Sequence, residues 1–447
     1  MALHQEAAVG CLSTAARPQK AGQKNGDCVL SLLKSWVESA NTATTDFPLN
    51  NLPCGVFSVG DGALRCGVAI GDFILDISAL EAEGLLTLAD HPVFDVPFWN
   101  ELMEMGPAVW ADFRAQITAM LVQNASKRWI VEDHLLPMAG ARLHLPFLVA
   151  EYTDFYAGKN HAINVGSMLR DPANPLPPNW LHMPIGYNGR ASSVVVSGTD
   201  VRRPLGQLKP ADAAVPYFGA SKRFDFELEL GAVLGCASEG PVSVAQADAM
   251  IFGYVLLNDW SARDIQAWEY QPLGPFQAKA TATTISPWIV MAAALQPFRL
   301  PTPARDVPLL PYLREPAPML YNIDLQVGLT PDGGVETQIS RTNAAQLYYS
   351  SAQQLCHHTS SGCPMNVGDL LGSGTISGPT KPERGSLLEL GWGGKEPLPI
   401  TGGTRSFIED GDTITLRGHC IGEDYKIGFG SCSGKLVPAM DLPDWAK

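Results

Sequence analysis

A series of apolar, β-branched segments beyond residue 190 constrains the fold of this chain more than any other feature. The segments span residues 193–197, 226–236, 250–258, 284–292, 319–328, 386–392 and 411–418. Pro-rich stretches at 172–178 and 297–318 interrupt them. Many strands with few helices predict a β-dominated (α+β) domain. Because Gly and Pro gather between Ala139 and Leu145, we place a boundary there and assign residues 146–447 to this domain.

A smaller β-rich domain is predicted over residues 46–145. Residues 55–78, GVFSVGDGALRCGVAIGDFILDIS, fit strands with hairpin signals at Asp61-Gly62 and Gly71-Asp72. The segment 109–126 has helical spacing instead, through Phe113, Ile117, Met120 and Leu121. This pattern predicts a compact β unit followed by one amphipathic helix.

We expect residues 1–45 to form an extension that is disordered or partly helical. Within it, residues 28–39, CVLSLLKSWVES, fit a short amphipathic helix. Residues 1–26 contain no secretory apolar core, and their charged side chains are Glu6, Arg17, Lys20 and Lys24. That composition fits either an organelle transit peptide or a disordered extension.

Composition excludes several classes of protein. Apolar residues make up 46% of the 447 residues and charged ones 17%, which favours a loop-rich and sheet-rich enzyme over a disordered chain. The formal charge of -14 argues against nucleic acid or an anionic membrane as the main partner. No apolar run approaches the roughly 18 residues that a membrane span needs. Nine scattered cysteines indicate reduced thiols and a cytoplasmic location.

The closest set of zinc-ligand residue types is Cys356, His357, His358 and Cys363. Its spacing matches no standard zinc pattern. The competing interpretation, which we favour, is a helix end followed by a loop, with buried side chains.

The sharpest local signal is FDFELEL, residues 224–230. On a strand, its strict alternation places Asp225, Glu227 and Glu229 on one face. Three like charges in a row repel one another. Either this is an edge strand whose acids face water, or a hard cation neutralises Glu227 and Glu229.

The next segment favours the cation. Residues 251–257 form a continuous apolar strand that should be buried on both faces, and it ends in the polar pair Asn258 and Asp259. A helix then begins, with Ser261 as a suitable N-cap. Arg263 and Gln266 share one face of that helix and could clamp an anion. Alternatively, Arg263 only pairs with Asp264 or Glu269.

Three further segments carry candidate functional groups. YTDFYAGKNHA, residues 152–162, holds several polar side chains around His161, and His is suited to proton transfer near neutral pH. Lys279 lies among small uncharged residues, which suggests partial burial and therefore a partner or a lowered pKa. Thr375 lies in a Gly-rich turn. Glu389 interrupts the apolar segment 387–390, which is costly unless the carboxylate is paired or functional.

Two common motifs are absent from the sequence. The Gly-rich stretch 372–378 lacks the Gly-Lys-Ser/Thr ending of a phosphate loop. There is also no Gly-x-Ser-x-Gly elbow, which argues against a serine hydrolase.

Taken together, these segments resemble the fumarylacetoacetase family from about Phe47 to the end. The motifs that carry the resemblance are long: YTDFYAGKNHAINVG at 152–166, LPPNWLHMP at 176–184, GYNGRASSVVVSGT at 186–199, FDFELEL at 224–230, NDWSARDIQAWEYQPLGPF at 258–276 and SGTISGP at 373–379. The resemblance implies an SH3-like N-terminal β-barrel, a larger mixed β-roll domain and a homodimer. It also implies hydrolysis of a small-molecule diketo acid, 4-fumarylacetoacetate, to fumarate and acetoacetate in tyrosine catabolism.

The resemblance also implies roles for individual residues. Its metal ligands fall on Asp154, Glu227, Glu229 and Asp259, with Lys279 and Thr283 lining the same site. All-oxygen ligation suits Mg²⁺ or Ca²⁺, the metals that the family uses. Its substrate contacts fall on Tyr156, Arg170, Tyr187, Arg263, Gln266 and Thr375. Its catalytic residues fall on His161 and Glu389, with Lys279, Arg263 and Gln266 stabilising charge.

Two alternatives to this function stay open. One is a related enzyme, such as an acylpyruvate hydrolase or an oxaloacetate decarboxylase, which shares the metal carboxylates. The other is a binding protein built on an inactive hydrolase fold, against which the presence of His161, Glu389 and the four carboxylates argues. The main departure from the family pattern is Ala282, where the family usually has Gly, and it could shift the backbone beside Thr283.

Overall fold

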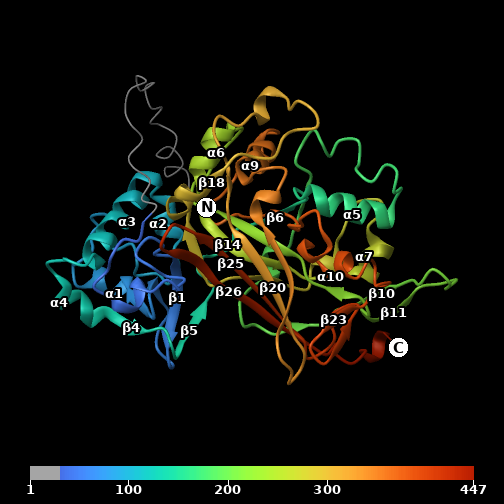
Figure 1. The fold of residues 1–447 in the computed structure, drawn as a ribbon, viewed down its shortest axis with the longest axis horizontal. Coiled ribbons are helices and arrows are strands. Elements are labelled where there is room, and N and C mark those ends of the chain that lie inside the picture. The colour runs from blue at the N-terminus through green and yellow to red at the C-terminus, as the bar shows by residue number, and fades with distance from the viewer. Residues whose placement is uncertain (1–30, 447) are drawn as a thin grey trace.

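The computed structural model describes residues 31–446, and within them the protein is strand-rich with mixed α and β structure (Figure 1). One sheet of 13 strands runs through the whole molecule in the order β4-β3-β2-β1-β17-β14-β13-β22-β6-β7, with β5 on β1, β16 on β14 and β8 on β16. Its strands are β1 (Cys54–Val59), β2 (Arg65–Ile70), β3 (Phe73–Asp76), β4 (Leu135–Pro137), β5 (Ala141–His144), β6 (Tyr152–Phe155), β7 (Gly186–Asn188), β8 (Val194–Val196), β13 (Leu228–Leu234), β14 (Ile251–Asp259), β16 (Thr283–Ile285), β17 (Trp288–Met291) and β22 (Leu370–Gly372).

A second sheet of five strands packs against β14 of the first. Its order is β21 (Thr337–Asn343), β20 (Asp324–Thr330), β25 (Thr413–Ile421), β26 (Lys426–Val437) and β9 (Val201–Arg202). Because β14 is a central strand of the first sheet and the second sheet packs against it, all of its residues are buried, as its continuous apolar sequence predicts. The two-stranded ladders are β10 (Leu205–Leu208) with β11 (Tyr217–Ala220), β12 (Phe224–Asp225) with β15 (Ser261–Ala262), β18 (Arg299–Leu300) with β19 (Leu320–Tyr321) and β23 (Leu398–Ile400) with β24 (Gly403–Arg405).

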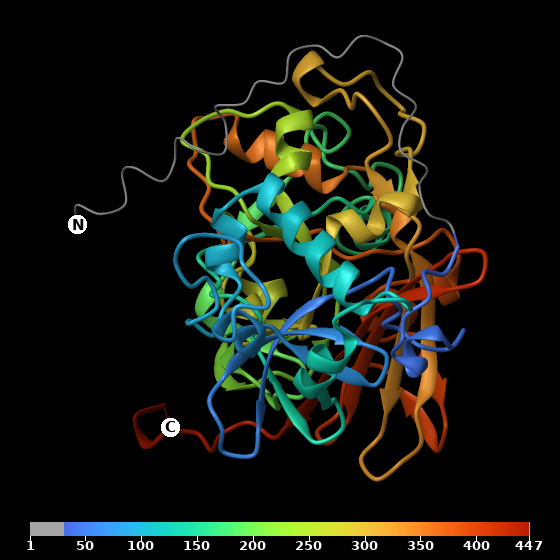
Figure 2. The same ribbon diagram turned by 90° about the vertical axis from the view of Figure 1, so that its left-hand side faces the viewer.

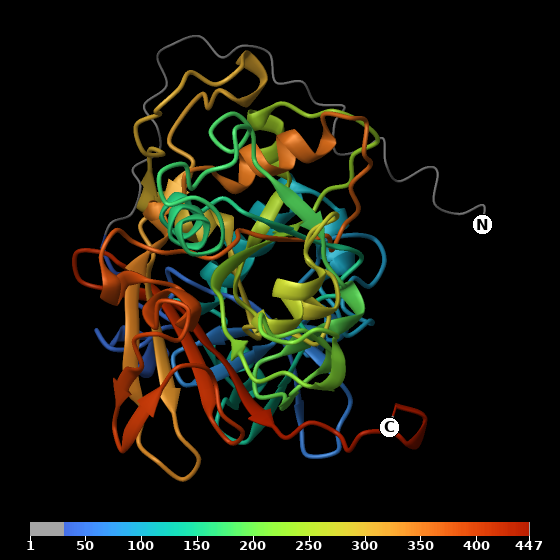
Figure 3. The same ribbon diagram turned by 90° about the vertical axis from the view of Figure 1, so that its right-hand side faces the viewer.

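The helices are short and lie around the edges of the sheets. Figure 2 shows the N-terminal helices on the near side of the molecule, and Figure 3 shows α5 end-on from the opposite side. They are α1 (Ile77–Ala82), α2 (Asn100–Glu104), α3 (Pro107–Leu121), α4 (Arg128–Val131), α5 (Lys159–Leu169), α6 (Val244–Met250), α7 (Arg263–Glu269), α8 (Ala292–Leu295), α9 (Ser351–Thr359) and α10 (Leu387–Leu390). Among residues 31–446, each helix is too short or too polar to cross a bilayer.

The N-terminal strands form the antiparallel order β5-β1-β2-β3-β4, and β1 also pairs with β17. The predicted turn at Gly71-Asp72 joins β2 to β3, and Gly71 has the positive φ of 55° that this tight connection needs. In the described part of the chain no ladder joins β4 to β5, so the sheet is open. The description as an SH3-like barrel therefore stays a prediction.

Several local expectations are wrong. The helix expected over 28–39 is absent from its described part: Ser35 forms a bridge with Val122, and only the 3-10 helix η2 (Glu38–Asn41) follows. Residues 1–30 of the expected extension lie outside the described residues, whereas residues 31–45 are described and bury Trp36, Val37 and Ala40. The strand expected at 386–392 is interrupted by helix α10, which Ser386 caps by accepting the backbone N–H of Glu389. Ser261 does not cap α7; its hydroxyl donates to the carbonyl of Asp259 at 3.1 Å.

Candidate active site

Three strands of the 13-stranded sheet bring the predicted carboxylates together. Asp154 lies on β6, Glu229 on β13 and Asp259 at the end of β14, and the short strand β22 separates β6 from β13. Gly372 on β22 leaves the space they share: a Cβ there would lie 2.8 Å from Asp154 Oδ1 and 3.1 Å from Glu229 Oε2. Any larger residue at position 372 would therefore push these two carboxylates apart.

Asp154, Glu227, Glu229 and Asp259 form a buried acidic cluster whose oxygens lie within 4.8 Å of one another. Asp154 Oδ1 and Glu229 Oε1 are buried without a hydrogen-bond partner. Burial, and after it repulsion from the neighbouring carboxylates, raises the pKa values of Asp154 and Glu229 well above the usual carboxyl range. A cation at this point would satisfy both orphaned oxygens, so these residues fit a metal ion that prefers oxygen ligands.

Two buried cations already border this acidic cluster. Lys279 Nζ donates to Glu227 and, at 2.6 Å, to Asp259. Arg263 donates from Nη2 to Glu227 and from Nε to Asp225, each at 2.8 Å. Burial alone would raise the pKa of Glu227, but the charges of Arg263 and Lys279 outweigh burial and lower it. The folded protein therefore favours the ionised form of Glu227.

Neutral side chains complete the surroundings of the cluster. The Tyr187 hydroxyl donates to Asp259 Oδ2 at 3.1 Å, and Thr283 Oγ1 lies 3.4 Å from Asp259 Oδ1. Gln266 Oε1 accepts from Arg263 Nη1 at 3.1 Å. Arg263 therefore pairs with the carboxylates and with Gln266, and not with Asp264 or Glu269 as the alternative interpretation proposed.

His161 and Glu389 form a buried pair beside the cluster. His161 Nδ1 lies 2.6 Å from Glu389 Oε2, and its Nε2 lies 3.8 Å from Glu227 Oε1. The charge and hydrogen bond of His161 outweigh burial and lower the pKa of Glu389. Since an ionised carboxylate only accepts hydrogen bonds, Nδ1 carries a proton, and this is the proton that stays when the ring is neutral. That tautomer leaves the lone pair of Nε2 facing the acidic cluster.

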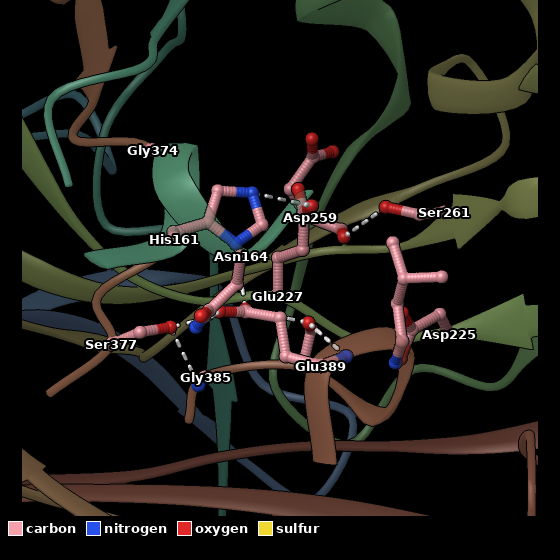
Figure 4. Close-up of polar contacts among 12 residues, drawn as sticks. His161, Asn164, Asp225, Glu227, Asp259, Ser261, Gly374, Ser377, Gly385 and Glu389 are labelled. Atoms are coloured by element: carbon pink, nitrogen blue, oxygen red, sulfur yellow. Dashed lines mark hydrogen bonds and ion pairs between the residues drawn. The ribbon is translucent and has the colours of Figure 1, made fainter. Parts of the chain in front are cut away.

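Glu389 is held by more than its histidine. Asn164 Nδ2 donates to Oε1 at 2.8 Å, while Ser377 Oγ and Ser386 Oγ donate to Oε2 at 3.0 and 2.8 Å. Figure 4 shows Asn164, Ser377 and Glu389 gathered on one side of the His161 ring. None of the three supporting residues Asn164, Ser377 and Ser386 was predicted from the sequence. The Ser386-x-x-Glu389 spacing of a helix start was the signal that could have found one of them.

A cavity of about 360 Å³ opens onto both groups. Its wall includes the acidic residues Asp154, Glu227 and Glu229, together with Tyr156, His161, Arg170, Tyr187, Arg223, Arg263, Gln266, Lys279 and Thr375. Burial raises the pKa of Tyr156 to about 12, so its hydroxyl keeps its proton and can donate. Thr375 Oγ1 is buried without a partner. Each predicted substrate-contact residue therefore lines this one cavity.

Two other candidates do not contribute to this site. Asp225 shares the alternating pattern of FDFELEL but accepts the backbone N–H groups of Leu387 and Leu388 instead of joining the acidic cluster. Cys356, His357 and His358 lie on α9, where each contacts a different polar atom of Tyr312 or Thr153. No zinc site forms there among the described residues. The six cysteines 54, 66, 356, 363, 420 and 432 carry free thiols, as expected, but Cys236 is disulfide-bonded, so the expectation of reduced thiols is wrong for that residue.

Comparison with known proteins agrees with this architecture. Residues 50–146 match the family described as Fumarylacetoacetase N-terminal, and residues 151–437 match Fumarylacetoacetate (FAA) hydrolase C-terminal. The fumarylacetoacetase of Arabidopsis thaliana is 46% identical over 92% of this chain and 100% of its own length. That of Homo sapiens is 47% identical over 89% of this chain and 97% of its own. The crystal structure of Cg1458 with inhibitor shares the fold, with a TM-score of 0.50 and 16% identity over 87% of this chain and 100% of that one.

Proposed function

This chain belongs to the fumarylacetoacetate hydrolase family and is a hydrolase, and from that membership we propose that it cleaves 4-fumarylacetoacetate to fumarate and acetoacetate, the last step of tyrosine and phenylalanine catabolism. The observation that carries the proposal is that two functional groups lie beside the same cavity. The buried acidic cluster and the His161–Glu389 pair both face it. Hydrolysis of a carbon–carbon bond needs both an activated water and an electron sink, and these two groups are suited to supply them.

We propose Mg²⁺ or Ca²⁺ as the cofactor, held by the four carboxylates of the acidic cluster with Lys279 and Thr283 beside it. Four carboxylates and no sulfur or imidazole favour a hard cation. When bound, such a cation supplies Lewis-acid polarisation of the diketo oxygens. The buried position of the oxygens and the two without a partner support this assignment.

His161 is the proposed general base. Its Nε2 faces the cavity with a free lone pair, because Glu389 holds the proton on Nδ1. It takes a proton from water, and the hydroxide adds to the carbonyl carbon of the fumaryl group. Glu389 stabilises the imidazolium that forms, as a carboxylate does in other His–carboxylate pairs.

The surrounding cations and hydrogen-bond donors stabilise the negative charge that develops on the substrate in the next steps. Arg263, Gln266 and Lys279 stabilise the oxyanion on the attacked carbon. When the carbon–carbon bond breaks, its electron pair stays with the acetoacetate fragment. Lys279 Nζ or a water molecule then protonates that carbon. Tyr156, Tyr187, Thr375 and Arg170 are proposed to hold the remote part of the substrate through their hydroxyls and guanidinium.

Three further proposals rest on the sequence and the resemblance. We propose a homodimer and a cytoplasmic location, the second supported by scattered cysteines of which six carry free thiols. We also propose that the order β5-β1-β2-β3-β4 is a partly open, SH3-like barrel over residues 46–145, with the catalytic β-roll domain over 146–447.

The ultraviolet absorbance of 4-fumarylacetoacetate, followed with purified protein before and after EDTA treatment, tests this function. We expect its loss to require the divalent ion, and Mg²⁺ or Ca²⁺ to restore it. Glu389→Gln should lower kcat by about a thousandfold or more, because the amide no longer fixes the His161 tautomer. Folded, metal-supplied protein that leaves the absorbance unchanged would contradict the assignment and direct the assay to other diketo acids.

A further inference from the structure

The proposed substrate carries two negative charges, and this inference rests on that proposed function. Fumarate has two carboxylates and acetoacetate has one, while hydrolysis creates one new carboxylate. The intact substrate therefore has two, one at each end of the molecule. An enclosed cavity that binds a dianion needs a separate cation or donor set for each end.

Four cationic side chains line the cavity: Arg170, Arg223, Arg263 and Lys279. Two of them are already committed to protein carboxylates. Arg263 pairs with Asp225 and Glu227, and Lys279 pairs with Glu227 and Asp259. Their charge is thus largely balanced before any substrate arrives.

Arg170 and Arg223 are different from this pair. Among residues 31–446 neither has an ion-pair partner, although the chain as a whole is strongly acidic. Arg170 donates to the carbonyl of Pro175 at 3.1 Å. Arg223 donates from Nη2 to the carbonyl of Gly393 at 2.7 Å, and its guanidinium lies 4.8 Å from the Phe407 ring centroid. A guanidinium has five N–H donors, so each keeps donors for an incoming anion.

The guanidinium group of Arg170 lies near Gly166 of α5, and that of Arg223 lies near Gly393. A Cβ built on Gly166 of α5 would lie 3.0 Å from Arg170 Nη2. A Cβ built on Gly393 would lie 4.0 Å from Arg223 Nη2 and 3.8 Å from Met168 Sδ. Residues 166 and 168 point to opposite sides of a helix. The two guanidinium groups therefore lie near different sides of α5, and no carboxylate of the described residues forms an ion pair with either.

We propose that Arg223 binds the second carboxylate of the substrate, the one that Arg170 does not bind, and so selects diketo acids with a carboxylate at both ends. Arg223 then contributes to ground-state binding and takes no part in the bond-breaking step. Because the Phe407 ring restricts one face of the guanidinium, its free N–H edge can meet a carboxylate side-on.

Steady-state kinetics of Arg223→Gln and Arg223→Lys test the proposal on the full, metal-loaded chain. We expect Arg223→Gln to raise the KM for 4-fumarylacetoacetate about tenfold with kcat nearly unchanged, and Arg223→Lys to restore much of the affinity because it keeps the charge. Arg128→Gln is the matched control, since Arg128 also lies over a ring, that of Trp36, but outside the cavity. Its KM should equal that of the wild type.

Product inhibition supplies a second readout that does not depend on turnover chemistry. The inhibition constant of either fumarate or acetoacetate should rise with KM in Arg223→Gln, and that product identifies the carboxylate bound. A KM and inhibition constants that stay at wild-type values in an active enzyme would overturn the role of Arg223 while leaving the hydrolase function intact. Wild-type protein without activity on 4-fumarylacetoacetate would overturn both.

Discussion

At the scale of single residues, several buried carboxylates, such as those of Asp225, Glu227 and Asp412, are compensated by a cation. Asp369, just before β22, is a case without full compensation: it is 3% exposed, Oδ2 accepts the Asn366 N–H at 2.8 Å, and Oδ1 has no partner. Burial raises the pKa of Asp369 to about 6. Because Asp369 lies outside the acidic cluster, we expect burial of its carboxylate to lower the stability of the fold without affecting the site.

The raised pKa of Asp369 predicts a pH dependence of stability. In the unfolded chain this carboxyl ionises near its ordinary pKa of 3.8, but in the folded chain only near 6. The folded state therefore binds the proton more tightly, and stability is lost as pH rises through this window. Since the two pKa values differ by roughly two and each unit corresponds to about 1.4 kcal/mol, Asp369→Asn should stabilise the protein by up to about 3 kcal/mol at pH 7 and by much less at pH 4.

Thermal unfolding of both proteins at pH 4 and pH 7, with metal present, measures that difference. A stabilisation of equal size at both pH values would contradict the titration argument. It would show that the amide gains a hydrogen bond instead.

Single residues also show what the sequence could predict and what it could not. Most of the predicted site residues line one cavity, but Asp259, Thr283 and Glu389 are not among its lining residues. Strand ends and alternation indicated the carboxylates from the sequence.

Asp225 was predicted to share one strand face with Glu227 and Glu229, but β12 ends after it and β13 begins only at Leu228. The sequence alternates without interruption, but the strand is interrupted for two residues. This interruption depends on tertiary contacts, in which Asp225 accepts the N–H groups at the start of α10. The proposed catalytic roles stay predictions until they are tested.

At the scale of elements, helix α7 positions two cations of the site. It presents Arg263 at its start, and at its end Glu269 accepts the backbone N–H groups of Phe276, Gln277 and Ala278 at 2.8, 3.1 and 2.8 Å. Those residues begin the 3-10 helix η5 (Gln277–Lys279), which carries Lys279 to the acidic cluster. The carboxylate of Glu269 thus holds both ends of the loop between α7 and η5 together.

Glu269→Gln should therefore lower kcat by about tenfold, because a single carbonyl oxygen cannot hold three N–H donors and Lys279 loses its placement. Glu81→Gln is the matched control: Glu81, on the last turn of α1, accepts the N–H groups of Val93 and Phe94 at 2.8 and 2.7 Å, far from the cavity. Both variants should lose some thermal stability, but Glu81→Gln should keep the wild-type kcat. Equal kcat values in the two variants would contradict the positioning role of Glu269.

The element scale also shows where sequence patterns are ambiguous. The strand predicted at 250–258 agrees with β14 (Ile251–Asp259), whose nine residues are all buried. A continuous apolar run of this kind is typical of a central strand. The segment 386–392 was assigned to a strand, yet its four residues Leu387–Leu390 form α10. A short apolar run has no periodicity to separate strand from helix. The Ser386 cap is a local contact, but the contact of Glu389 with His161 joins positions 228 residues apart.

At the scale of the whole molecule, the two family-matched regions share one sheet and one core. Gly55 of β1 pairs with Trp288 of β17, and Trp110 of α3 packs edge-on against Phe252 of β14 with ring centroids 5.2 Å apart. The same buried hydrophobic cluster continues from Trp36 to Leu436. The regions should therefore unfold together.

Gly55→Ala tests this coupling. A Cβ at position 55 would lie 2.4 Å from the Trp288 ring, and overpacking of this kind costs about 1–3 kcal/mol. We expect one calorimetric transition in both proteins, lowered by a few degrees in the variant, with activity lost in the same temperature range. Two separate transitions, with activity surviving the first, would show that the N-terminal strands are an independent unit.

The pairing of β1 with β17 has a consequence for how the protein is made. When β1 leaves the ribosome, its partner strand has not been translated, and residues 60–287 must first be added. At cellular elongation rates that interval is on the order of ten seconds to a minute. During this time the edge of β1 at Cys54 and Gly55 is an unpaired strand edge, open to pairing with other nascent chains. Slow codons or scarce chaperones before residue 288 should therefore reduce the yield of native enzyme more than equal delays after it.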